Sequence, residues 1–120
     1  MLVTAQASAR PISAPMLIGP LLDRLEPQIR IVHLKLFMQS DAGYLKAALT
    51  SNGQEPTVEG ALDASPSAEH DILLNVRALN DPESLRAIVE REFEALPARM
   101  EWRHVECFRP SPPVPFHRGQ

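Results

Sequence analysis

Cysteine is nearly absent from this sequence, since Cys107 is the only one among 120 residues. A lone cysteine excludes a disulfide within the chain and agrees with the reducing environment of the cytoplasm. The five glycines are scattered, so the chain has neither a phosphate-binding loop nor a dinucleotide-binding fingerprint. No segment resembles the nucleophile elbow of hydrolases. These absences predict a chain that is not an enzyme of these classes.

Long apolar runs are lacking as well. No stretch approaches the roughly 20 apolar residues that a helix needs to span a bilayer, and residues 1–10 lack the basic start and apolar run of a signal peptide. Positive charge is not in excess, because 12 Lys and Arg residues stand against 15 Asp and Glu residues, a net charge of −3. A chain without a basic field is poorly suited to nucleic acid. We therefore expect a cytoplasmic chain with neither membrane nor nucleic-acid partners.

Proline, by contrast, is abundant, with 12 residues that lie mostly outside the middle of the chain. A length of 120 residues corresponds to one domain with a modest core. We predict a flexible leader over residues 1–14, one folded domain over residues 15–109 and a Pro-rich tail over residues 110–120.

The clearest pattern is the alternation of apolar residues over 30–39 and 44–51, which predicts two antiparallel strands. Gly43 closes the turn between them, because glycine tolerates a positive φ. If Gln39 pairs with Tyr44, the apolar faces of both strands coincide, and a slip of one residue would separate them. The residues on this shared face are Val32, Leu34, Leu36, Met38, Leu45, Ala47 and Leu49.

A third strand, ending at Leu62, is predicted after Asn52 and Gly53, which form the strongest hairpin signal in the chain. A two-residue loop places Lys46 opposite Glu59. Pro56 would then lie at a hydrogen-bonded position with no N–H to donate, so the loop is longer or a bulge intervenes. A polar loop over residues 63–69 follows.

Two helices and two further strands complete the predicted domain. An apolar stripe predicts a helix over residues 15–26, and Asp81 with Pro82 begins a second one that ends before Pro97. Residues 70–79 and 100–109 are predicted strands. The order predicts an α+β fold, a mostly antiparallel sheet of four to five strands with two helices packed on one face. Trp102 is expected to support the sheet from beneath.

The polar face of the first two strands is the candidate interaction surface. It is either a solvated sheet face or a docking surface, because aromatic rings interspersed with cations are typical of interfaces. Its residues are His33, Lys35, Phe37, Tyr44 and Lys46. The Pro-rich tail is interpreted as a disordered end, a recognition segment or a strap across its own domain, with His117 and Arg118 near its end.

Cys107 has histidines nearby in the sequence, which makes these side chains candidate metal ligands. His104 and Cys107 lie three residues apart, which places them on opposite faces of a strand. His33 would approach them only if the first and last strands were adjacent. We assign no metal site, and these three residues are the candidates for an alternative function, a small standalone metal-binding (zinc) or redox protein. A ligand pocket between sheet and helices is a further alternative.

The segment IVHLK, from Ile31 to Lys35, is entered from an amphipathic helix and followed by two hairpins, a strand–helix unit and a closing strand. In this it resembles the C-terminal domain of the CobW-type GTPases. The segments ECFRP at 106–110 and PFHR at 115–118 look like the tail of some members of that family. The likeness covers about residues 20–118.

The resemblance implies a family that couples GTP hydrolysis to the handling of zinc or to cobalamin-linked metal insertion. The phosphate loop and metal motif of that family lie in an N-terminal domain that is absent from this sequence. GTP and zinc, or another divalent metal, are therefore implied only for a relative or a partner, not as cofactors here. What the resemblance implies for this chain is an accessory domain that docks on a GTPase domain or a metalloprotein client. The residues of this chain that match the family-like segments are His33, Lys35, His117 and Arg118. The resemblance is also compatible with a homo-oligomer.

Overall fold

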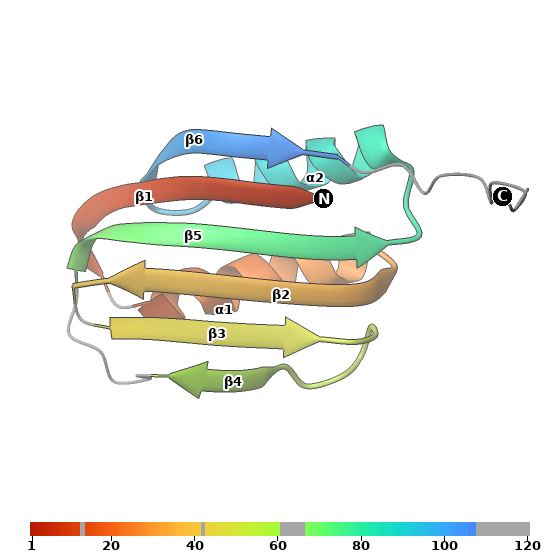
Figure 1. The fold of residues 1–120 in the computed structure, drawn as a ribbon, viewed down its shortest axis with the longest axis horizontal. Helices are drawn as coiled ribbons and strands as arrows, with labels where there is room; N and C mark the ends of the chain where they lie inside the picture. Colours follow the sequence, from red (N-terminus) through yellow and green to blue (C-terminus); the bar gives the residue numbers. More distant parts are fainter. Residues whose placement is uncertain (13, 42, 61–66, 108–120) are drawn as a thin grey trace, which may run out of the picture.

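The computed structural model describes residues 1–12, 14–41, 43–60 and 67–107. Its strands form one six-stranded antiparallel sheet in the order β4-β3-β2-β5-β1-β6. Figure 1 shows both α-helices on the same side of this sheet. The α+β class is confirmed, with six strands rather than four or five. In chain order the elements are β1 (Leu2–Ile12), α1 (Ala14–Leu25), the 3-10 helix η1 (Glu26–Gln28), β2 (Ile31–Ser40), β3 (Gly43–Leu49), β4 (Thr57–Gly60), β5 (Ser67–Ala78), α2 (Pro82–Glu94) and β6 (Arg99–Glu106).

The connections form two interlocked β-α-β units. Helix α1 joins β1 to β2 with β5 between them, and α2 joins β5 to β6 with β1 between them. This is the split β-α-β arrangement of ferredoxin-like domains. The β3–β4 hairpin extends the sheet beyond β2. Because this arrangement supports many functions, the function has to come from particular residues.

Strand β1 replaces the flexible leader that the sequence predicts for residues 1–14, so that prediction is wrong. The strand lies between β5 and β6 and pairs with both. Its inward residues Val3, Ala5 and Ala7 are buried. Two of these are alanines and their neighbours Thr4 and Gln6 are short or polar, so the alternation is too weak to separate a strand from a loop. Pairing on both sides supplies what the local pattern lacks.

The predicted register of β2 and β3 is confirmed. Gln39 pairs with Tyr44, Leu34 pairs with Leu49, and Gly43 has a φ of 129°. One inward residue is predicted wrongly, because Val32 is 48% exposed and Ile31 is buried instead. The pairing of β2 with β5 shifts between Ile31 and His33, and such a bulge moves the side chains before it to the other face.

The β3–β4 hairpin keeps the predicted pairing of Lys46 with Glu59 but has a longer loop, residues 50–56. Pro56 therefore precedes β4. The Asn52 amide donates to the carbonyl oxygens of Glu26 and Ile29 and accepts from the Ile31 amide, at 2.8 Å each. These bonds fasten the loop to η1. Strand β5 begins at residue 67 rather than 70, while residues 61–66 lie outside the described part of the chain.

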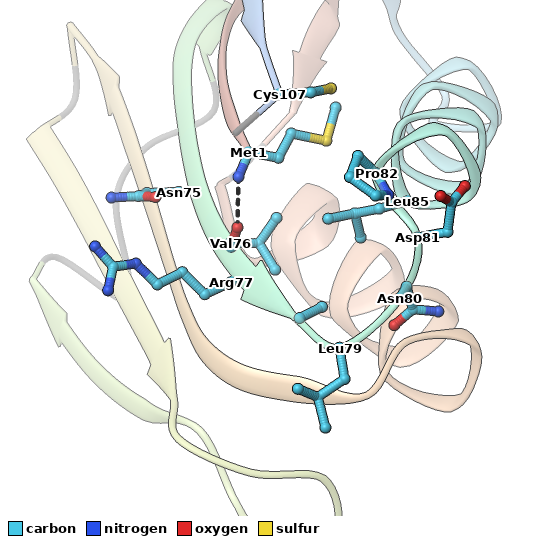
Figure 2. Close-up of a pocket in the computed structure, with 11 residues that line it drawn as sticks. Met1, Asn75, Val76, Arg77, Leu79, Asn80, Asp81, Pro82, Leu85 and Cys107 are labelled. Atoms are coloured by element: carbon cyan, nitrogen blue, oxygen red, sulfur yellow. Dashed lines mark hydrogen bonds between the residues drawn. The ribbon is translucent and has the colours of Figure 1, made fainter. Parts of the chain in front are cut away.

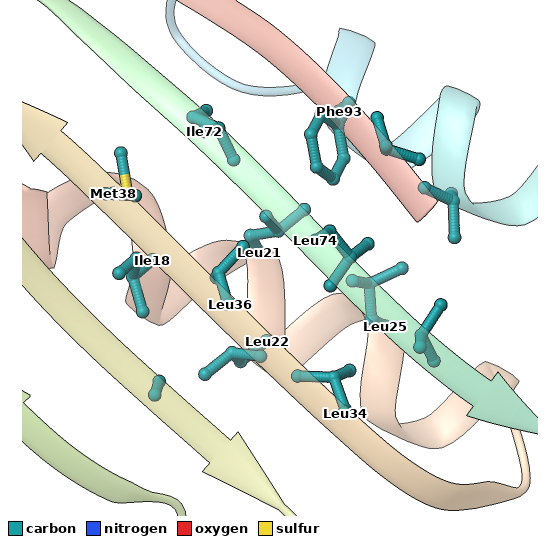
Figure 3. Close-up of a cluster of buried hydrophobic side chains, with 14 of the residues drawn as sticks. Ile18, Leu21, Leu22, Leu25, Leu34, Leu36, Met38, Ile72, Leu74 and Phe93 are labelled. Carbon is teal, nitrogen blue, oxygen red and sulfur yellow. The ribbon is translucent and has the colours of Figure 1, made fainter. Parts of the chain in front are cut away.

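The helices cover the inner face of the sheet, and Figure 3 shows the resulting core. Helix α1 contributes a stripe of leucines and Ile18 that lies against β2 and β5, and α2 contributes Phe93. Asp81 caps α2 as predicted, accepting from the Ser84 amide at 3.1 Å. Trp102 lies beneath the sheet as predicted, its ring stacked on Phe93 with centroids 5.4 Å apart. Strand β6 is predicted to run to residue 109 but ends at Glu106.

The outer face of the sheet carries none of the described helices or strands. Its residues alternate with buried residues along β1, β3 and β5; in β5, for example, Ile72, Leu74 and Val76 are buried and Leu73 and Asn75 are exposed. We call it the open face. Neither helix in the described ranges has the length and apolar character needed for a bilayer crossing.

Candidate functional site

The structure brings four of the predicted surface residues together on the open face. Lys35 and Phe37 lie on β2, and Tyr44 and Lys46 lie on the adjacent β3, with Phe37 directly opposite Lys46. Both lysines are exposed, Tyr44 is 47% exposed and Phe37 is half-buried. The predicted residues His117 and Arg118 lie outside the described residues.

An aromatic pair under a cation forms the middle of this group. The rings of Phe37 and Tyr44 lie with centroids 6.0 Å apart. The Lys46 ammonium lies 5.6 Å from the Phe37 centroid and 5.7 Å from that of Tyr44. An ammonium at this distance is attracted to the negative faces of the rings. The contact holds the long Lys46 side chain against the aromatic pair and leaves its charge available at the surface.

His33 precedes Lys35 on β2, next to the bulge and on the Lys35 side of it, and is opposite Arg77 of β5. It is half-buried, and Arg77 is exposed. Neither His33 nor Lys35 is buried in the hydrophobic interior, so both lie on the polar side of β2 as the strand pattern predicts. Arg77 adds a cation that the sequence does not associate with this group, because β5 is remote in the chain.

Two leucines extend the aromatic pair into an apolar stripe. Leu73 of β5 lies opposite Phe37 and is 37% exposed. Leu2 of β1 is half-buried and lies diagonally next to Leu73, since Leu73 pairs with Thr4 and Asn75 pairs with Leu2. We call these four residues, Tyr44, Phe37, Leu73 and Leu2, the apolar stripe. It crosses four neighbouring strands of the open face. Sequence reasoning missed the leucines because nothing local indicates that β5 and β1 lie beside β2.

The charged side chains around the apolar stripe are not consumed by ion pairs. In the described part of the chain, the salt bridges join Arg86 to Glu90, Arg91 to Glu92 and His104 to Glu106. None of them involves Lys35, Lys46 or Arg77. Glu59 pairs with Lys46 across the strands without an ion pair. The open face therefore offers cations next to apolar surface.

The metal candidates do not converge. His33 lies on β2 and Cys107 follows β6, with β5 and β1 between these strands. Three strand spacings amount to about 14 Å, far beyond a shared coordination sphere. The condition under which His33 would approach the last strand, adjacency of β2 and β6, is therefore not met. His104 contacts Glu106 at 3.1 Å instead. Among the described residues, no group of three or more metal-ligating side chains gathers at one point.

A cavity of about 810 Å³ lies on the helix side, at the end of β5. Figure 2 shows Met1, Val76, Pro82 and Leu85 around it, with Asn75 and Arg77 pointing away from this apolar wall. The Met1 ammonium donates to the Val76 carbonyl oxygen at 2.7 Å, and burial lowers the pKa of this amine.

The polar side chains at the rim of this cavity serve the backbone. Asn80 accepts from the Arg30 amide at 2.8 Å and donates to the Gln28 carbonyl oxygen at 3.3 Å. Asp81 caps α2. These hydrogen bonds hold the β5–α2 turn against η1, so within the described residues the rim presents no convergent polar group that would select a ligand.

Comparison with known proteins adds no relative. The chain matches no protein-family model, and searches of curated proteins and of solved structures give no match. The resemblance to the CobW-type C-terminal domain therefore rests on the sequence pattern alone, and the open face is the strongest candidate site.

Proposed function

We propose that this chain is a non-catalytic interaction domain whose open face binds another protein. One observation carries the proposal: Phe37, Tyr44 and Leu73 form uncovered apolar surface beside cations that have no ion-pair partner among the described residues. Aromatic residues and cations at the centre of a surface are typical of protein interfaces, where aromatic anchors supply most of the binding energy.

The resemblance supplies a candidate partner. A CobW-type GTPase domain, or a metalloprotein client of such a GTPase, would be the protein that this accessory domain contacts. GTP and the metal would then be bound by the partner. On this proposal the chain has no catalytic residue and no cofactor of its own.

The test is a calorimetric titration of this chain into a CobW-type GTPase domain that lacks its own C-terminal domain. We expect saturable binding and a changed rate of GTP hydrolysis. Replacing Phe37 and Tyr44 together by alanine should weaken binding at least about tenfold, because two aromatic anchors are lost. The control is Asp23→Lys, an exposed position on α1, on the helix side of the sheet. Equal affinity of the double variant and the wild type would refute the role of the open face.

A further inference from the structure

We infer that the open face binds a second copy of this chain, with a twofold axis along the apolar stripe. This inference rests on the proposed function, since both require the open face to bind protein, and it adds a second copy of the chain as an occupant of that face in competition with the GTPase domain. It follows from the direction of the stripe and from the placement of charges on its two sides.

The direction of the apolar stripe suits a twofold pair of sheets. From Tyr44 to Leu2 the stripe crosses three strand spacings, about 14 Å, and advances from the level of Asp71 to that of Asn75, about 13 Å along the strands. It therefore runs at about 45° to the strands. Rotation about this line places the strands of the second copy at about 90° to those of the first, which is one of the two arrangements that facing sheets adopt.

Charges of opposite sign lie on the two sides of the apolar stripe. One side carries the exposed cations Lys35, Lys46 and Arg77, with the carboxylate of Glu59 beyond Lys46 at the β4 edge, and the other carries the exposed carboxylates Glu69, Asp71 and Glu101. At the far edge of the sheet, β6 carries charges of both signs. The twofold rotation exchanges the two sides, so the cationic side of each copy meets the acidic side of the other. Such an interface is self-complementary, as a twofold contact requires.

Lys46 and Asp71 form the most specific pair in this arrangement. The middle of the apolar stripe lies between Phe37 and Leu73, which are opposite each other. Lys46 lies about 7 Å from this point across the strands, and Asp71 lies about 7 Å from it along the strands. Viewed onto the sheet, the twofold rotation acts as a reflection across the stripe, which runs at 45° to the strands. This reflection exchanges the positions of Lys46 and Asp71. Each Lys46 therefore faces Asp71 of the second copy, and the contact occurs twice in the dimer.

The experiment measures the molar mass of the full chain against concentration by sedimentation velocity. We expect the wild type to form a dimer. Lys46→Asp and Asp71→Lys should each raise the dimer Kd at least about tenfold, because each places like charges together twice. An equimolar mixture of the two variants should form a heterodimer of near wild-type affinity, because both contacts then join opposite charges. Asp23→Lys on α1 makes the same charge change as Asp71→Lys and should leave the Kd unchanged.

Each outcome either supports or overturns the twofold dimer. A wild type that stays monomeric throughout the concentration range overturns it, as does a dimer that both reversals leave intact or a mixture that does not recover. If the chain is monomeric but the GTPase domain binds and the Phe37/Tyr44 double variant does not, only the second copy is refuted and the proposed function stands. If neither binds, both are refuted. If the dimer and the GTPase complex both form, the two partners should compete for the open face.

Discussion

The two faces of the sheet are formed by alternate residues of the same strands but differ in burial, because the helices cover only one of them. On the helix side Leu34, Leu36 and Leu74 are at most 1% exposed. On the open face their neighbours Lys35, Phe37 and Leu73 remain at least partly accessible. The comparison indicates that consecutive positions on one strand contribute to different properties. Inner residues contribute to the free energy of unfolding, whereas on the proposed function outer residues determine what the folded domain binds.

The adjacent residues Leu74 and Leu73 give the largest expected contrast. Leu74→Ala removes a fully buried side chain and leaves a cavity, so we expect a loss of about 2–5 kcal/mol in the free energy of unfolding. Leu73→Ala, at a position 37% exposed, should cost less than about 1 kcal/mol. Urea denaturation at low protein concentration measures both. Comparable losses in the two variants would mean that the open face is covered after all.

A second experiment tests how much the hydrogen bonds between the β3–β4 loop and the η1 region contribute to stability. Asn52→Ala removes the bonds to Glu26, Ile29 and Ile31, and the backbone groups of Ile29 and Ile31 are partly buried. Leaving such groups without partners should destabilise the domain by about 1–3 kcal/mol. Ser51→Ala, at the exposed neighbouring position, is the matched control. Equal stability of both variants would show that the loop is held by other contacts.

A third, smaller effect concerns Glu92, the buried carboxylate on the covered side. The Gln28 side chain donates to Glu92 Oε2 at 2.8 Å, and this bond, aided by Arg91, lowers the pKa of Glu92 below its ordinary 4.5 against the opposing effect of burial. A carboxyl group with a lowered pKa stabilises the fold above its unfolded-state pKa, and this contribution is lost as the pH falls through its folded-state pKa. Glu92→Gln should therefore destabilise the domain at pH 7.

The pH dependence of that variant is the measurement that matters. The difference in unfolding free energy between wild type and Glu92→Gln should shrink as the pH falls below about 4.5, because the unfolded state then takes up the proton more readily, and it should level off once Glu92 is neutral in both states. Denaturation curves at a series of pH values will show the trend. A difference that grows on acidification would contradict the assigned direction of the pKa shift.

Local patterns were sufficient for the parts of the fold made by neighbours in the sequence. The register of β2 with β3 follows from matching periods and a short turn, and the cap of α2 follows from Asp81 and Pro82. The candidate site was found only in part by the same means. Phe37, Tyr44 and Lys46 belong to one hairpin and were identified together, whereas Leu73, Leu2 and Arg77 come from strands distant in the chain.

The sequence by itself thus determined where the two α-helices lie, how β2 and β3 align and which of their side chains share a face, since periodicity and turn chemistry act over a few residues. Only the tertiary structure decided that β1 is a strand, that β5 lies between it and β2, and that a stripe of four apolar residues crosses the open face. The reason is physical: hydrogen bonds between distant strands are satisfied equally well by many partners, and no local pattern names the one that the packed core selects.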